Sequence, residues 1–197
     1  MSITWGTQLF DADNDADIDL FMAGGAPVNS FHGALFGNRP LPNALLVNDG
    51  TGQFTEQTAR SGLAAPGPGI GTALVDIDRD GWLDLAVFSY RGRFRFYANR
   101  GARIWPKHTA LRVELTGRGA NLRALGAQVT LTTTHGQQQR CFNIPQPGLA
   151  GGSEVACHFG LGLSDIQSVA IQWPNGRVDT LDPKTKRGQF VRCSQPK

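Results

Sequence analysis

Two short stretches of this 197-residue chain share four aspartates with the same spacing Asp-x-Asp-x-Asp-x-x-x-Asp, and the first stretch holds Asp17 in addition. Loop 1 spans residues 11–19 and loop 2 spans residues 76–84, and each runs directly into an apolar, strand-like segment. The aspartates are Asp11, Asp13, Asp15 and Asp19 in loop 1 and Asp76, Asp78, Asp80 and Asp84 in loop 2. Carboxylates this close repel one another, and Ca²⁺ neutralises such a group because it takes roughly six to eight oxygen ligands in a flexible geometry. We therefore expect two calcium ions, one in each loop.

The spacing assigns a role to each loop position. Side chains at positions 1, 3, 5 and 9 turn inward, and position 7 offers a backbone carbonyl, from Asp17 in loop 1 and from Trp82 in loop 2. Gly81 at position 6 permits a left-handed backbone conformation. Ala16 holds this position in loop 1, where the left-handed conformation costs about 1 kcal/mol. We therefore expect loop 2 to be the better formed site.

The aspartate loops have two other interpretations, an EF-hand and a metal-free acidic loop. An EF-hand needs a bidentate Glu at position 12, but this chain has Met22 and Val87 there, and strand-like segments follow the loops instead of amphipathic helices. The other alternative is an acidic surface loop that binds no metal ion.

The elements around the loops form an internal repeat. With a shift of 65 residues, the segment 5–11 aligns with 70–76, and both segments end in the first aspartate of a loop. Residues 43–54 read as a strand, a tight turn and a second strand, and residues 94–101 are their counterpart after loop 2. Repeats of this length with several short strands predict propeller blades or a related β repeat.

These residues carry a resemblance to a known family. The Gly-Thr pair, the aspartate loop, the Asp-Leu pair and the following strand pair resemble the FG-GAP or VCBS repeat over residues 1 to 101. Segments 111–115, 126–131, 158–162 and 169–177 look like an ASPIC/UnbV domain. The order of the two resembles the cartilage acidic protein-like family. The resemblance implies propeller blades with structural calcium loops, followed by a small β domain.

The second half of the chain reads as all-β without that resemblance. Apolar residues alternate in the segments 111–115 and 169–173, and Asn175-Gly176 marks a hairpin turn. Together with 25 Gly and 11 Pro, this pattern predicts a compact β-sandwich with Trp173 in its core. We therefore expect an all-β chain: an incomplete propeller over residues 1–104 and an ASPIC/UnbV-like, sandwich-like domain over residues 105–197.

The number of repeats is too small for a closed ring. Propellers typically close with about four to eight blades, whereas this chain holds one full repeat and parts of its neighbours. Missing upstream blades, assembly with other chains, or packing of the blades on the C-terminal domain would each cover the open faces. We expect the first, a C-terminal part of a longer protein. The chain opens without a signal peptide, and the resemblance implies a secreted, cell-envelope or periplasmic location.

Catalytic and nucleic-acid motifs are missing from the sequence. No histidine lies in a zinc-binding pattern, and we expect His158, in a strand-like segment, to be structural. The net charge is only +3, which argues against nucleic acid as a partner, and no apolar stretch is long enough for membrane insertion. The odd number of cysteines, Cys141, Cys157 and Cys193, leaves their oxidation state open.

The function expected is a non-catalytic, calcium-binding adhesion module for a protein or glycan ligand, with no catalytic residue. The alternative is the scaffold part of a metal-assisted lyase or hydrolase that acts on carbohydrates.

Overall fold

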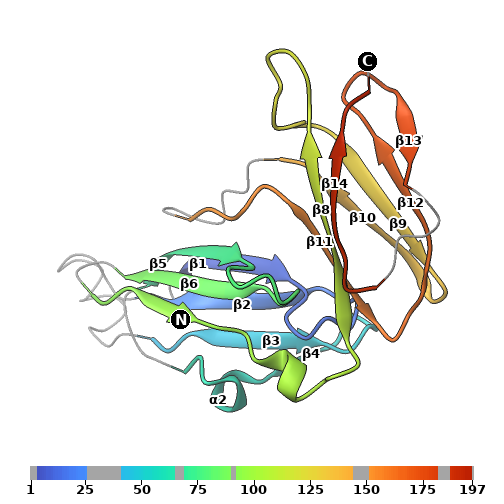
Figure 1. Cartoon of the computed structure of the whole chain (residues 1–197). Coiled ribbons are helices and arrows are strands. Elements are labelled where there is room, and N and C mark those ends of the chain that lie inside the picture. Colours follow the sequence, from blue (N-terminus) through green and yellow to red (C-terminus); the bar gives the residue numbers. More distant parts are fainter. Residues whose placement is uncertain are drawn as a thin grey trace.

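The computed structural model describes residues 4–25, 41–64, 69–89, 92–143, 151–181 and 187–196. These residues form almost only β-strands, in two parts that follow one another along the chain (Figure 1). The all-β prediction is confirmed. Among the described residues, no helix is long and apolar enough to cross a membrane.

The first part begins with a four-stranded antiparallel sheet in the order β1-β2-β3-β4. Its strands are β1 (Thr4–Phe10), β2 (Asp19–Gly24), β3 (Ala44–Asn48) and β4 (Phe54–Glu56). Loop 1 connects β1 to β2, and the turn predicted after residue 47 connects β3 to β4. The short helix α2 (Thr58–Ser61) follows β4.

A three-stranded sheet repeats this plan in the order β5-β6-β7. Its strands are β5 (Gly69–Val75), β6 (Asp84–Ser89) and β7 (Arg95–Tyr97), with loop 2 between β5 and β6 and the 3₁₀ turn η1 (Gly101–Arg103) after β7. The inner strands β1 and β5 lie side by side, and the Thr72 hydroxyl donates to the Thr7 carbonyl at 3.4 Å. Phe10, Phe21, Leu45, Leu74 and Leu85 belong to one core shared by both sheets. The two sheets are adjacent blades that do not close into a ring, as predicted.

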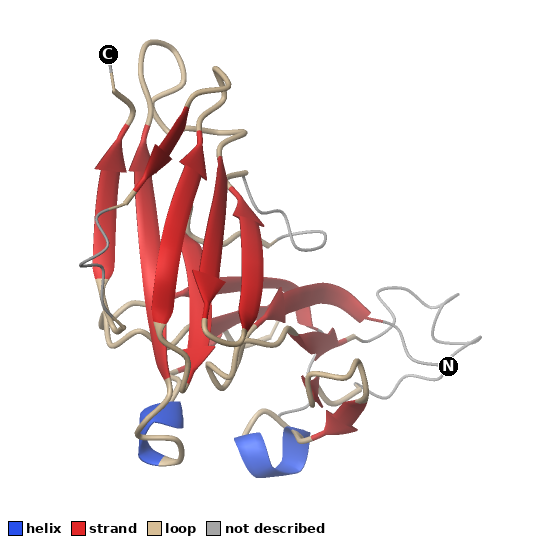
Figure 2. Ribbon diagram, turned by 90° about the vertical axis from the view of Figure 1, so that its right-hand side faces the viewer, coloured by secondary structure: helices blue, strands red, loops and turns tan. Residues whose placement is uncertain are grey.

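The C-terminal part is a sandwich of two sheets, in the orders β10-β9-β12-β13 and β11-β8-β14. The strands are β8 (Thr109–Thr116), β9 (Gln128–Thr133), β10 (Gly136–Cys141), β11 (Cys157–Gly162), β12 (Ile166–Gln172), β13 (Val178–Thr180) and β14 (Phe190–Ser194). Its core includes Leu111, Val129, Phe159, Ile171 and Trp173. Trp173 is buried as predicted, and its indole N–H donates to Asp179 at 2.6 Å. The sandwich adjoins the repeat region at the end where the aspartate loops lie, between β1 and β2 and between β5 and β6 (Figure 1). Figure 2 shows that the long strands of the sandwich run at a steep angle to those of the repeat region.

Candidate metal sites

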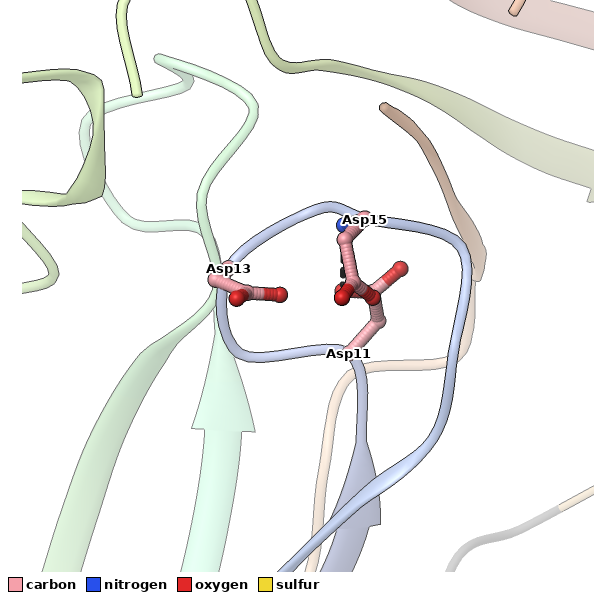
Figure 3. Close-up of side chains that lie close together, drawn as sticks. All are labelled: Asp11, Asp13 and Asp15. Carbon is pink, nitrogen blue, oxygen red and sulfur yellow. Dashed lines mark hydrogen bonds between the residues drawn. The ribbon is translucent and has the colours of Figure 1, made fainter. Parts of the chain in front are cut away.

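Loop 1 brings three of its aspartates together. Asp11, Asp13 and Asp15 each offer a carboxylate oxygen, and these oxygens lie within 4.8 Å of one another. Figure 3 shows the three side chains directed into the space that the loop encloses. Asp11 is buried, while Asp13 and Asp15 are half-buried.

Backbone amides hold these carboxylates in place. Asp11 accepts hydrogen bonds from the backbone N–H of Asp15 at 3.1 Å and of Ala16 at 2.8 Å, and Asp15 accepts from the N–H of Asp17 at 2.9 Å. These bonds tighten the loop around its own side chains. The aspartate spacing therefore builds a compact group of oxygen atoms.

Loop 2 reproduces this arrangement position by position. The carboxylates of Asp76, Asp78 and Asp80 form the same group, with ligand atoms within 4.8 Å. Asp76 accepts from the N–H of Asp80 at 3.1 Å and of Gly81 at 3.0 Å, and Asp80 accepts from the N–H of Trp82 at 2.9 Å. Two sites built alike from a repeated sequence indicate one purpose for both.

The aspartates at position 9 have a different surrounding. Asp19 accepts the backbone N–H of Ala12 at 2.8 Å and of Asn48 at 2.9 Å. Asp84 accepts the N–H of Ile77 at 3.2 Å and of Asn99 at 2.8 Å. Neither belongs to its loop's group of three carboxylates. Each therefore ties the start of its loop to the end of the third strand of its blade, and its predicted role as a ligand stays a prediction.

Position 7 also combines two roles. The backbone N–H groups of Asp17 and Trp82 are bonded to the position 5 carboxylates, as described above. The Trp82 ring is buried, leaves no room for a Cβ on Gly101, and stacks on Trp105 with 6.5 Å between ring centroids. The contribution of the Asp17 and Trp82 carbonyls to a bound ion stays a prediction.

The backbone at position 6 is left-handed in both loops. Gly81 has φ 87° and Ala16 has φ 89°. Alanine thus adopts the conformation that the loop demands, at a cost that glycine avoids. The expected strain in loop 1 is present.

Some carboxylates of each loop have a pKa above that of free aspartate. Burial, followed by repulsion from Asp15, raises the pKa of Asp11 well above its usual value and the pKa of Asp13 to about 7. Burial is also the main cause that raises the pKa of Asp76 to about 6. A bound cation removes this repulsion, so its binding must release protons and weaken as the pH falls.

One atom of loop 1 points directly to a missing partner. The buried Oδ1 of Asp13 has no hydrogen-bond partner among the described residues, in a group that consists of hard oxygen donors. Both features fit a hard divalent cation. The two groups of three aspartates can hold metal ions.

The two loops are bonded to each other. The side-chain amide of Asn14 in loop 1 donates to the Gly81 carbonyl in loop 2 at 3.0 Å, and the amide of Asn99 donates to the Ala12 carbonyl at 2.9 Å. The sites therefore form one polar layer across both blades.

The C-terminal domain also contacts both loops. The backbone N–H of Gly162 donates to the Asn14 carbonyl at 2.6 Å, and the Nδ1 of His108 lies 2.8 Å from the Asp13 carbonyl oxygen. The Nε2 of His158 lies 3.1 Å from the Gly81 carbonyl oxygen. Burial lowers the pKa of His158 to about 4, so the ring is neutral at pH 7. Because a carbonyl only accepts, its Nε2 carries the proton.

Gly160 allows the closest approach of the two domains. A Cβ atom built on this residue would lie 1.8 Å from Oδ2 of Asp11. His158 was expected to be structural, whereas no sequence pattern indicated that Gly160, His108, Asn14 or Asn99 lies at the sites. Their partners are 15 to 149 positions away in the chain, and no local spacing encodes such contacts.

Blade-like sheets with repeated carboxylate loops, followed by a β-sandwich, define a β-repeat protein with a C-terminal β domain. Comparison with known families agrees: residues 11–87 match the FG-GAP-like repeat, and residues 117–196 match the ASPIC and UnbV family. The chain therefore matches an FG-GAP-like repeat followed by the ASPIC and UnbV family, in the order that the sequence predicted.

The same chain is similar to cartilage acidic protein 1 from several animals. It is 29% identical to the Mus musculus protein over 185 residues, which cover 85% of this chain and 25% of the relative. It is 29% identical to the Homo sapiens protein over 185 residues, with 85% and 24% covered, and 28% identical to the Xenopus tropicalis protein over 180 residues, with 86% and 25% covered. The chain thus spans about a quarter of the length of these relatives.

Proposed function

We propose that this chain is a calcium-stabilised, non-catalytic β-repeat module that binds a protein or glycan. The observation that carries the calcium proposal is the pair of identically built carboxylate groups, one of which contains a buried oxygen without a partner. Calcium suits them better than magnesium, which keeps more of its water and demands a stricter octahedral geometry. Each ion would join the two ends of a loop that links neighbouring strands.

A structural role for the ions agrees with the surroundings of the carboxylates. The carboxylate oxygens of Asp11 and Asp76 accept hydrogen bonds from backbone N–H groups of their own loops, and both side chains are buried. A carboxylate that is saturated by a cation is a poor general base. These surroundings support a non-catalytic module in preference to a metal-assisted carbohydrate-active enzyme.

The cellular location of the protein is also part of the proposal. Millimolar calcium is typical outside cells, where loops with moderate affinity stay loaded. We therefore place the protein outside the cell, in the envelope or in the periplasm, with further blades supplied by an upstream part of a longer protein or by other chains. The similarity to cartilage acidic protein 1 supports this placement.

Calcium-dependent stability tests the proposal. An ion that binds only the folded chain stabilises it by about 2.7 kcal/mol at a concentration 100 times the Kd. Adding millimolar Ca²⁺ to chelator-treated protein should therefore raise the melting temperature, as measured by calorimetry. Asp80→Ala should remove most of that gain, because it deletes a ligand of the less strained loop.

Asp165→Ala is the matched control. This aspartate is exposed, lies in the C-terminal domain and is outside both carboxylate groups. It should leave the calcium gain intact. An identical melting curve with and without Ca²⁺ for the parent chain would refute the proposed calcium sites.

A further inference from the structure

A cavity of about 560 Å³ opens between the two blades. Its walls come from β1, β3 and α2 of the first blade and from β6, β7 and the segment through η1 of the second. The volume lies within the range of about 300–1,000 Å³ that is usual for small-molecule sites.

The wall of the cavity is apolar over much of its surface. Phe10, Leu45, Leu83 and Leu85 line it, and they belong to the core that the two blades share. An apolar ligand group would therefore continue the hydrophobic core and would remove its exposed wall from water.

Tyr97 adds a polar group to this wall. It lines the cavity, and its hydroxyl oxygen is buried without a hydrogen-bond partner among the described residues. A buried hydroxyl with no partner costs free energy, and a ligand would recover part of it only if the Tyr97 ring turned its hydroxyl into the cavity.

Two arginines supply positive charge. Arg60 on α2 and Arg100 before η1 line the cavity, and both side chains are exposed. Neither forms a salt bridge with a carboxylate within the described part of the chain. Guanidinium groups bind carboxylates, sulfates and phosphates through paired N–H donors. Asp13 also borders the cavity, so an anionic group is expected at the arginines and away from loop 1.

We propose that this cavity is a binding site for a small amphipathic anion, whose apolar body lies between the blades and whose acidic group pairs with Arg60 and Arg100. The cavity shares only Asp13 with the two groups of carboxylates, and the proposal does not require that a cation is bound there. The shared chemistry is an apolar chain or ring system that carries one acidic group, either as a free molecule or as a lipid.

Calorimetric titration of the full chain with laurate tests the proposal, below the micelle concentration and in chelator, because Ca²⁺ precipitates laurate. Laurate should bind with a 1:1 ratio, and dodecylamine, with the same chain and the opposite charge, should bind at least ten-fold more weakly. The effect of Ca²⁺ on stability is measured separately, without laurate, so laurate binding without a calcium effect on stability would leave this site standing alone.

Variants locate the site. Arg60→Gln and Arg100→Gln should each weaken laurate binding about ten-fold, whereas Arg123→Gln, an exposed arginine of the C-terminal domain, should have no effect. Val47→Phe narrows the cavity that Val47 lines and should weaken laurate and dodecylamine alike. Cosedimentation with phosphatidylglycerol vesicles, lost in Arg60→Gln, would identify a membrane lipid as the source, and its absence a free molecule.

Three results would overturn the proposal. They are equal affinity for laurate and dodecylamine, an equal loss of affinity in Arg123→Gln, and no laurate binding to protein that still melts cooperatively.

Discussion

At the scale of residues, the aspartates of each loop have two different roles. Positions 1, 3 and 5 meet as a group, and position 9 is taken up by backbone amides. Position 6 supplies the left-handed turn that lets the group close, with alanine in one loop and glycine in the other. The two loops thus allow the free-energy cost of one left-handed backbone conformation to be compared between alanine and glycine.

Exchanging the residues at position 6 should change stability in opposite directions. Ala16→Gly removes a strained Cβ and should stabilise the chain by about 1 kcal/mol, less the entropy that glycine adds to the unfolded chain. Gly81→Ala should destabilise it by about 1 kcal/mol. No atom lies within 4 Å of a Cβ built on Gly81, so the loss reports the backbone alone.

Thermal unfolding in chelator measures both variants. A change of 1 kcal/mol corresponds to about 2–4 °C for a chain of this size. Equal shifts of the same sign would contradict the strain assigned to Ala16.

At the scale of elements, each blade closes its loop onto its own third strand. Asp84 joins Ile77, at the start of loop 2, to Asn99, just after β7. Asp19 makes the same connection to Asn48 at the end of β3. In each blade, a single carboxylate therefore holds the start of the loop against the end of the third strand, because it accepts one hydrogen bond from each.

Substitution of two aspartates in loop 2 should separate this connection from metal binding. Asp84→Asn puts an N–H₂ group against a backbone N–H and should cost about 1–3 kcal/mol even in chelator, because a buried donor loses its acceptor. Asp78 is exposed and accepts only a long bond of 3.4 Å from Asp80. Asp78→Asn should therefore have little effect in chelator and should reduce the stabilisation by calcium.

Urea unfolding with and without Ca²⁺ measures both effects. If Asp78→Asn and Asp84→Asn behaved identically in chelator, the separate roles of positions 3 and 9 would be wrong.

At the scale of the whole molecule, the C-terminal domain packs on β5 of the second blade. Gly152 and Glu154 donate backbone hydrogen bonds to Thr72 and Leu74 of β5, at 3.0 and 3.1 Å. This packing is one of the three arrangements that the sequence left open. Phe88, Phe94 and Phe96 of the second blade stay exposed, and further blades to cover such a surface remain our proposal.

The close contact of Gly160 with Asp11 should contribute to the stability of the packing between the two domains. Gly160→Ala forces a Cβ against the carboxylate and should destabilise the chain by about 1–3 kcal/mol, as overpacking does. It should also lower the stabilisation by calcium, because it displaces a ligand of loop 1. Calorimetry with and without Ca²⁺ measures both.

Gly152→Ala is the control for this substitution. A Cβ built on Gly152 meets nothing within 4 Å, so the variant should melt like the parent. A Gly160→Ala chain with unchanged stability would show that the domains do not press on loop 1.

The sequence by itself determined the all-β class, the repeat, the two aspartate loops and the strain at Ala16. These features are local: a spacing of two along a strand or loop decides which side chains share a face, and one residue decides a turn. The tertiary structure decided the rest. It showed that position 9 is tied to a distant strand, that both loops meet the C-terminal domain through His108, His158 and Gly160, and that a cavity remains between the blades. Such contacts join residues far apart in the chain, and only the packing of whole sheets brings them together.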